Sequence, residues 1–201
     1  MLLIKPDRLS VNDSMREIQV HGTKGFPFQG YMNEDRDTEG EGWHWHSETE
    51  IIFVLEGKIR CGVNGAQFEL KEGEGIFINS GSLHMAGLHA GIYKGRSVSF
   101  VFSPEFISGD SKGLLYRKYV EPVTENPDFK GCLLKKEIPW QREILDSLER
   151  IYTYCREEKW EGEILVRNEL SRAWALLAEK EKPENGIYIE KPGNTKQEKR
   201  V

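Results

Sequence analysis

Residues 15–103 consist of short runs of β-branched and aromatic side chains, separated by turns that contain glycine. Seven of these runs have the composition of strands: REIQV, WHWH, EIIFVLEG, KIRCGV, AQFEL, GIFINS and SVSFVFS. Between the fourth and fifth runs, Asn64-Gly65 is a strong hairpin signal, because both residues tolerate positive φ. Many short strands at close spacing, with no helical pattern between them, predict an antiparallel sandwich or barrel.

The pattern changes after Pro104. Residues 105–137 are mixed and are interrupted by prolines, and from Pro139 the apolar residues recur at helical spacing. The first stripe consists of Ile144, Leu145, Leu148, Ile151, Tyr152 and Cys155. Gly162 breaks it, and the second stripe consists of Val166, Leu170, Ala173, Trp174 and Leu177. Two amphipathic helices joined by a short link predict an antiparallel pair over about residues 139–180.

Leu165 and Leu176 lie off the main stripe of the second helix. The stripes themselves are expected to cover the barrel, and a wider apolar face could in addition serve a partner subunit. Residues 183–201 are polar and contain prolines, glycines and charges, which is typical of a linker or tail. The predicted organisation is therefore a barrel with its connecting segment over 1–137, a helix pair over 138–182, and a linker or tail over 183–201.

Composition narrows the function classes. A chain of 201 residues with 38% hydrophobic residues can bury one real core. The 28 basic and 33 acidic residues give a net charge of -5, which argues against a chain that coats nucleic acid or an anionic membrane. No apolar run is long enough for a signal peptide or a membrane span, and three cysteines without a CxxC pair favour buried reduced thiols. We therefore expect a cytoplasmic protein with no membrane partner.

The candidate chemistry begins in the stretch HWHSETE. His44 and His46 differ by two positions, so both would project to the same face of a strand, and Glu50 follows four positions later. Such a set could hold a metal, hydrogen-bond a small ligand, or do nothing chemical. The stretch GEGIFINSGSLHMAG contributes His84, and together the two stretches resemble the two-part cupin signature. The resemblance implies a mainly β fold, a cupin-like double-stranded β-barrel (jelly roll), followed by the antiparallel α-helix pair.

Three positions depart from the usual cupin pattern. Asn79 replaces a proline, Leu88 replaces the closing asparagine, and Thr38 stands where a glycine is usual. In metal-binding cupins the residues at the matched positions hold one divalent ion, and here they would be His44, His46, Glu50 and His84. Three imidazoles and a carboxylate suit Zn, Ni, Mn, Fe or Co, and the sequence does not choose among them. The same four residues could instead line an effector pocket by hydrogen bonding alone, as in cupins without metal.

A second resemblance covers most of residues 15–180. The stretches VHGTKGFPF, HWHSETEIIFVLEG, NSGSLHMA and SVSFVFSPEFISG, followed by two helices, resemble the sensory half of AraC-family bacterial transcription regulators. The resemblance implies that the barrel binds a small effector, such as a sugar or a similar polar molecule, and that the helix pair forms a homodimer. It also implies that DNA is read only by a C-terminal domain with two helix-turn-helix motifs, for which this chain has no room before Val201. The expectation is a regulatory domain and not an enzyme.

The alternative is a free-standing metal-dependent cupin enzyme of the dioxygenase, decarboxylase or sugar isomerase type, to which the same four residues would be suited. No further acid, base or substrate-binding motif supports it. His21 and His89 lie outside the signature and are expected at the surface or in turns. Trp43 and Trp45 should point away from the histidines, whereas the strand pattern alone does not decide whether Tyr31, Phe53 and Arg96 reach the pocket.

Overall fold

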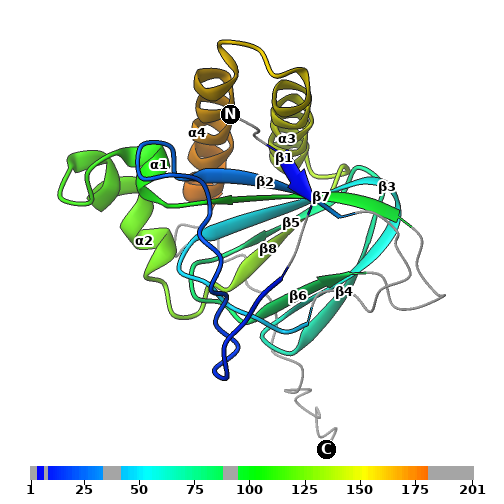
Figure 1. Ribbon diagram of the computed structural model, residues 1–201. Helices are drawn as coiled ribbons and strands as arrows, with labels where there is room; N and C mark the ends of the chain where they lie inside the picture. Colours follow the sequence, from blue (N-terminus) through cyan, green and yellow to red (C-terminus); the bar gives the residue numbers. More distant parts are fainter. Residues whose placement is uncertain (1–3, 7–8, 34–41, 88–94, 181–201) are drawn as a thin grey trace, which may run out of the picture.

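The computed structural model describes residues 4–6, 9–33, 42–87 and 95–180 (Figure 1). Eight strands form the sheet: β1 (Ile4–Pro6), β2 (Phe28–Asn33), β3 (Thr49–Val63), β4 (Ala66–Lys71), β5 (Gly75–Ile78), β6 (His84–Gly87), β7 (Gly95–Phe102) and β8 (Gly131–Leu134). The strand order is β1-β2-β7-β3-β5-β8, and β4 and β6 also pair with β3. This is the predicted barrel-type, mainly β architecture.

The long strand β3 connects the two halves of the barrel. Its first half pairs with β5 and β7, and its second half, from Lys58 onward, pairs with β4 and β6. The register shifts between Val54 and Glu56, where a bulge bends the strand. Gly57 follows the bulge with a φ of 69° and pairs with Gly95, where an added Cβ would lie 2.6 Å from the carbonyl oxygen of Glu56. Glycines therefore allow the close approach of strands β3 and β7 at this corner of the barrel.

Three sequence predictions of strands were wrong in detail. The runs EIIFVLEG and KIRCGV are one continuous strand, because the bulge bends the chain without ending its pairing. The runs REIQV and WHWH are not strands, and their described pairing is limited to isolated bridges such as Arg16↔Trp45 and His44↔His84. The Asn64-Gly65 hairpin is confirmed, since both residues have positive φ, 47° and 88°, between β3 and β4.

Three short strands that the sequence did not predict, β1, β6 and β8, complete the sheet. β8 lies in the segment expected to be mixed and pairs with β5, and β6 had no strand signal of its own. An antiparallel sheet was predicted, but β1 pairs in parallel with β2, so the sheet is mixed. These strands are three or four residues long, too short for a pattern of alternating polarity to show.

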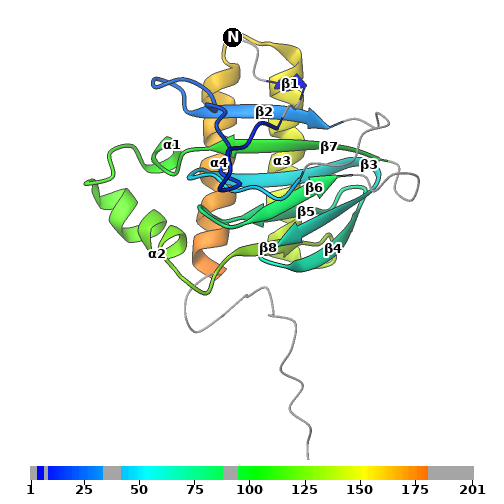
Figure 2. The same ribbon diagram turned by 60° about the horizontal axis from the view of Figure 1, so that its bottom comes forward.

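The sheet separates two hydrophobic cores. Residues of β3 such as Ile52 and Val54 face the barrel interior, where they pack with Ile59, Ile76 and other aliphatic side chains. Their alternate neighbours on β3 face outward and pack against two long helices, α3 (Pro139–Glu157) and α4 (Gly162–Lys180). Figures 1 and 2 show both helices together on one side of the sheet. The outer core contains large aromatic residues from the sheet and helices, among them Phe77, Phe100, Phe102 and Trp174.

The helix pair has the predicted extent. Pro139 is the first residue of α3, a position at which a backbone N–H has no partner within the helix, so its absence costs nothing. The helix ends at Glu157, and the next residue, Glu158, has left-handed φ and ψ. Arg150 of α3 and Glu169 of α4 form a two-point ion pair, with N–O distances of 2.8 and 2.9 Å. Leu165 and Leu176 are only half-buried and lie off the buried stripe of α4. The predicted linker or tail, residues 183–201, lies outside the described residues.

Three shorter helical segments, α1 (Glu105–Ser108), the π-turn η1 (Tyr116–Val120) and α2 (Glu121–Thr124), lead from β7 to β8. Asn79, at the end of β5, ties this connection to the barrel. Its buried side-chain amide donates to the carbonyl oxygens of Val123 at 2.9 Å and Phe129 at 2.8 Å. The departure from the cupin pattern at this position therefore has a structural role. Thr38 and Leu88 lie outside the described residues.

Other sequence expectations concern the cysteines and membrane spans. All three cysteines are buried, as the small hydrophobic residues they were expected to be. Among the helices of the described residues, none combines the length and the apolar character that crossing a membrane requires.

Candidate functional site

The four residues of the cupin signature reach the barrel interior from three segments. Glu50 lies on β3 in the same alternation as Ile52 and Val54, so its side chain enters the barrel. His44 and His46 precede this strand, and His84 is the first residue of β6. His44 and His84 exchange both backbone hydrogen bonds, with N–O distances of 2.9 and 2.8 Å, which places their side chains next to each other.

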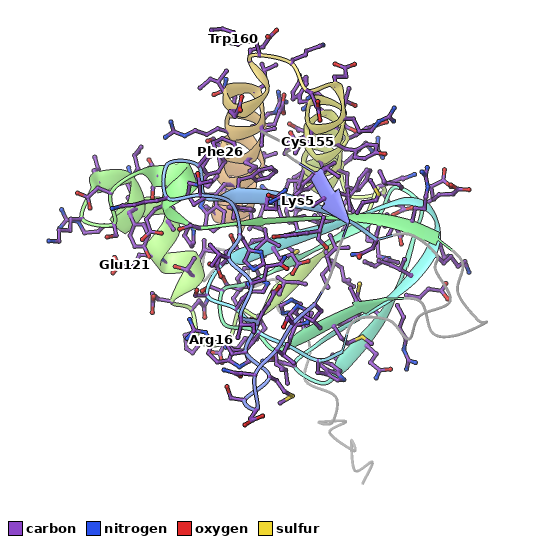
Figure 3. All side chains as sticks on the ribbon, in the orientation of Figure 1. Lys5, Arg16, Phe26, Glu121, Cys155 and Trp160 are labelled. Atoms are coloured by element: carbon purple, nitrogen blue, oxygen red, sulfur yellow. The ribbon has the colours of Figure 1, made fainter. Side chains whose placement is uncertain are left out.

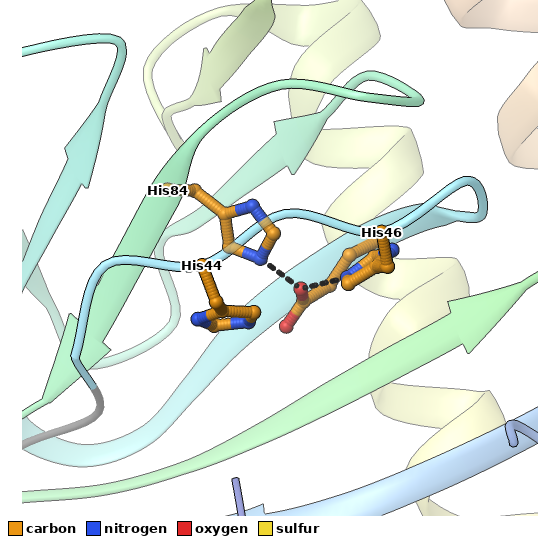
Figure 4. A group of neighbouring side chains, drawn as sticks. His44, His46 and His84 are labelled. Carbon is orange, nitrogen blue, oxygen red and sulfur yellow. Dashed lines mark hydrogen bonds and ion pairs between the residues drawn. The ribbon is translucent and has the colours of Figure 1, made fainter. Parts of the chain in front are cut away.

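The structure brings the four side chains together. One nitrogen or oxygen atom from each lies within 4.8 Å of all the others, and every one of these residues is buried. Glu50 Oε2 lies 2.9 Å from His84 Nε2 and 3.3 Å from His46 Nε2 (Figure 4). The rings of His44 and His84 are 4.1 Å apart between centroids. The arrangement is a compact set of three imidazoles around one carboxylate.

The outer nitrogen of each ring is occupied by a backbone carbonyl. The Nδ1 atoms of His44, His46 and His84 lie 2.9, 3.2 and 2.8 Å from the carbonyl oxygens of Gly42, Glu48 and Ser82. Because a carbonyl oxygen only accepts, each Nδ1 carries the proton, and in a neutral ring the Nε2 lone pair then points toward the centre of the set.

Lone pairs of three Nε2 atoms and a carboxylate oxygen repel one another unless a cation lies among them. That cation is either a proton on an imidazole or a metal ion. Backbone carbonyls that fix the tautomer and orientation of ligating histidines are the usual support of a metal site. The donor set of the buried cluster therefore fits a divalent transition metal.

The charges within the set are strongly coupled. Burial alone would raise the pKa of Glu50, but the contacts with His46 and His84 outweigh it and hold this pKa well below its usual value. Burial alone would lower the pKa of His84, but the adjacent Glu50 carboxylate raises it overall. For His44, burial and the neighbouring His84 both act to lower the pKa. Glu50 is therefore an ionised carboxylate and His44 a neutral imidazole at neutral pH.

A second polar group adjoins the four residues, and sequence reasoning missed it. His21 was expected at the surface or in a turn, but it is 6% exposed, and its ring lies 5.3 Å from that of His46. Its Nδ1 is 3.0 Å from the hydroxyl of Tyr31, and its Nε2 is 3.3 Å from Glu17 Oε2. Burial would lower the pKa of His21, but Glu17 raises it overall. The stretch VHGTKGFPF carried only a family resemblance, without a chemical signal for His21.

The remaining candidates are now placed. Phe53 belongs to the outer core beneath the helices and does not face the pocket. Arg96 is exposed and pairs with Glu56 at 3.1 Å. Trp45 lies outside the histidine set, with its indole N–H donating to the carbonyl oxygen of Ser14. The ring of Trp43 lies against Gly62 of β3. His89 lies outside the described residues.

A cavity of about 360 Å³ adjoins the site at His46. It is lined by residues 12 and 16–20 on one side and 46–48 on the other, and both Glu17 and His46 contribute to its wall. Arg16 also lines this cavity. In Figure 3, Arg16 is labelled at the opposite end of the molecule from Trp160, which lies at the tip of the helix pair. A volume of this size suits a small ligand.

Comparison with known proteins agrees with this architecture. Residues 33–89, which hold all four clustered residues, match the cupin domain family. The fold is a cupin barrel. The match contains β3 to β6 and excludes β7, the segment before residue 33 and both long helices.

The cupin and its helices together are similar to one curated protein. The "Uncharacterized HTH-type transcriptional regulator YdeC" of Bacillus subtilis (strain 168) is 26% identical over 185 residues, which is 90% of this chain. The chain spans 60% of the length of that relative.

Several solved structures align with smaller parts of the chain. DMSP lyase DddQ from Ruegeria pomeroyi DSS-3 is 19% identical, with a TM-score of 0.34 over 39% of each chain. An RmlC-like cupin from Shewanella frigidimarina NCIMB 400 is 16% identical, with a TM-score of 0.33 over 38% of this chain and 67% of its own. The polyketide cyclase RemF from Streptomyces resistomycificus is 26% identical, with a TM-score of 0.34 over 38% and 54%.

Proposed function

We propose that this chain is the effector-sensing and dimerising part of a bacterial AraC-type transcription regulator. The observation that carries the proposal is the extent of the similarity to a helix-turn-helix regulator, which covers 90% of this chain. It therefore includes both the barrel and most of the helix pair, whereas the cupin match alone ends at residue 89. Such a regulator acts in the cytoplasm, and its contact with DNA is made by a separate helix-turn-helix domain.

The proposed effector site is the interior of the barrel around His44, His46, Glu50 and His84. The effector is a small polar molecule, for which the cavity beside His46 provides a path of suitable size. We place one divalent ion, Zn, Ni, Mn, Fe or Co, on the same four residues, in accordance with their donor atoms and burial. When bound, such an ion offers coordination positions to oxygen or nitrogen atoms of the effector.

The proposed homodimer forms through α3 and α4. Leu165 and Leu176 are half-buried on α4 beside its core stripe; Leu176 also packs against the outer core, and the exposed part of both leaves apolar surface for a second copy. A two-fold contact of this kind uses the same face on both subunits. Binding of the effector would act on transcription by its different affinity for two arrangements of the dimer.

A metal-dependent cupin enzyme is the second candidate, and the buried cluster of three histidines and one glutamate supports it. The two candidates differ in what the helix pair does. A regulator requires the pair for dimerisation, whereas an enzyme requires only that the pair covers the barrel.

The experiment joins the whole chain to a DNA-binding domain that represses a reporter gene only as a dimer. We expect repression by the wild-type fusion and its loss in the double variant Leu165→Lys, Leu176→Lys. Absence of repression by a stable wild-type fusion would contradict the dimer. In a gel-shift assay at physiological salt, the unfused chain should show no sequence-specific binding to promoter DNA, because its charge is acidic overall.

A further inference from the structure

One wall of the barrel interior carries a row of polar side chains. Strands β2, β7 and β3 lie side by side in the sheet (Figure 2). On β3, Ile52 and Val54 face the interior, and their antiparallel partners on β7 are Ser99 and Ser97. Residues directly opposite each other in an antiparallel pair project to the same face of a sheet, so both serines also face the interior. Tyr31 of β2, the partner of Ser99, continues the row.

The opposite wall of the interior is aliphatic. The inner hydrophobic core takes its buried members from β3, β4, β5 and β6, and among the described residues none comes from β2 or β7. Ser97, Ser99 and Tyr31 are nevertheless only 3, 1 and 4% exposed. Their polarity therefore does not serve contact with bulk water, and the groups that their hydroxyls bind have to lie inside the barrel.

Ser99 is the member of this row whose contacts are incomplete. Its Oγ is buried and has no hydrogen-bond partner within the part of the chain that the structure describes. A buried hydroxyl without a partner destabilises a fold, whereas an alanine at the same position would not. A serine here is explained if a bound molecule supplies the missing partner.

The polar row adjoins the cluster of three histidines and Glu50. The hydroxyl of Tyr31 lies 3.0 Å from His21 Nδ1, and the ring of His21 lies 5.3 Å from that of His46. Along β7, Ser99 is two residues from Val101, which is paired with Glu50. Two residues on a strand span about 7 Å, so the unpartnered hydroxyl lies about that far along the wall from the carboxylate.

The charge of the cluster indicates what one end of the bound molecule carries. With a divalent ion in place, three neutral imidazoles and the Glu50 carboxylate leave a net charge of about +1 in a buried site. A single negative charge on the ligand compensates it. Between this charge and Ser99, the aliphatic pair Ile52 and Ile76 lines the interior, which suits methylene groups.

We infer that Ser99, with Tyr31 beside it, is the specificity-determining contact for a hydroxyl group of the effector, and that the effector is a short hydroxy acid whose carboxylate lies on the ion. The inference rests on the proposed function and names the ligand class of the same site. An extended chain advances about 1.2 Å per bond, so about 7 Å corresponds to about six bonds between the carboxylate oxygen and the hydroxyl oxygen. The molecule 5-hydroxypentanoate has this length.

The test compares 5-hydroxypentanoate with pentanoate, which has the same charge and stem but no hydroxyl. Each is titrated calorimetrically into the Co²⁺-loaded full chain. We expect the wild type to bind the hydroxy acid on the order of 10-fold more tightly, and Ser99→Ala to bind both acids within about twofold of each other. The shorter 3-hydroxypropanoate should have no such advantage over propanoate, because its hydroxyl does not reach Ser99.

Ser147 provides a matched control. It is a fully buried serine of α3 in the helix pair, and its hydroxyl accepts a hydrogen bond from Arg150 at 3.0 Å. Ser147→Ala removes the same group as Ser99→Ala but far from the ligand, so it should keep the wild-type preference for 5-hydroxypentanoate. An equal preference in Ser99→Ala and Ser147→Ala, or no preference in the wild type, would overturn the inference.

Thermal unfolding of the metal-free, ligand-free variants separates a binding role from a structural one. Because Ser99 Oγ has no partner, Ser99→Ala should leave the Tm within about 2 °C of wild type or raise it, whereas Ser147→Ala should lower it. A Ser99→Ala variant that is destabilised as strongly as Ser147→Ala, or that does not fold, would assign the hydroxyl to the fold and overturn the inference.

Failure of this inference is distinguishable from failure of the proposed function. Binding of pentanoate without any advantage of the hydroxy acid would overturn the role of Ser99 and leave the ion site as proposed. A wild-type chain that takes up no Co²⁺, or that binds neither acid, would overturn the ligand class together with the metal part of the proposed site. The dimerisation assay is independent of all these outcomes.

Discussion

The two faces of β3 and β7 differ in what they contact. The outer face carries Ile51, Phe100 and Phe102 and is sealed by the helix pair, whereas the inner face carries Glu50 beside aliphatic residues and opens toward a cavity at one end. Neighbouring residues on one strand thus belong to different environments. The difference indicates that most of the hydrophobic packing lies in the outer core, whereas the buried polar cluster lies on the inner face.

The largest expected effect tests the outer core. Phe100 is fully buried, stacks on Phe28 at 6.0 Å between centroids, and contributes nothing to the polar cluster. Phe100→Ala should lower the free energy of unfolding by about 3–5 kcal/mol because of the cavity it leaves. Denaturant unfolding measures this change. Co²⁺ affinity of the folded variant should stay close to wild type, and a large loss of affinity would contradict the separation of the two faces.

The inner face should respond in the opposite way. His46→Ala removes one imidazole of the cluster and should weaken Co²⁺ binding at least about 100-fold, or about 2.7 kcal/mol. Calorimetric titration gives the affinity, and unfolding in the presence of a chelator gives the metal-free stability. We expect that stability to change by less than about 1 kcal/mol, since the ring belongs to the polar cluster and to neither hydrophobic core. An unchanged affinity would show that the four residues do not bind the ion together.

The third prediction concerns the two half-buried leucines of α4 that lie beside its core stripe. Leu165→Lys with Leu176→Lys should convert a dimer into a monomer in sedimentation experiments at tens of micromolar, roughly the range in which weak dimers assemble. Ile164→Lys is the control, because it adds one such charge to α4 at a residue that is already 52% exposed. If both variants behaved alike, or if the wild type were a monomer, the interface would have to be sought elsewhere.

The smallest effect concerns the Arg150–Glu169 ion pair between the helices. The contact with Arg150 lowers the pKa of Glu169, so the pair stabilises the fold above the unfolded pKa of the carboxyl and loses this effect as the pH falls through the folded value. Glu169→Gln should cost about 0.5–1 kcal/mol at pH 7, a small amount because the pair is partly exposed.

That difference should diminish only below the usual pKa of a glutamate carboxyl and disappear as the pH falls through the lower pKa of folded Glu169. Glu143→Gln, which removes the exposed and longer ion pair to Arg172, should cost less. Stability curves measured at several pH values check both variants, and a cost that did not depend on pH would contradict the ionic contribution.

The sequence could predict those parts of the molecule that follow local rules. The Asn64-Gly65 turn, the two helical stripes and the spacing of His44, His46, Glu50 and His84 each depend on a few neighbouring residues. The continuity of β3 could not be read in this way, because Glu56-Gly57 resembles a break and only its pairing with Arg96 and Gly95 shows otherwise.

Glu17 and His21 were missed for a similar reason. Both lie in a segment without regular structure, and isolated bridges and a contact with Tyr31 bring them to the site. Such contacts join residues distant in the sequence and produce no periodic signal. The buried position of His21, like that of Glu17, is a property of the closed barrel and not of its own sequence neighbourhood.

The paired backbone bonds between His44 and His84 have a consequence for how the protein matures. These residues lie forty positions apart, and a slip of one residue in their register would turn an imidazole out of the barrel. A collapsed chain with most of its hydrophobic surface hidden would still lack a binding site until these two segments lock. Uptake of an ion during refolding should therefore occur after the tryptophan side chains are buried. The rate of ion uptake would then report how fast the pairing between the His44 and His84 segments forms.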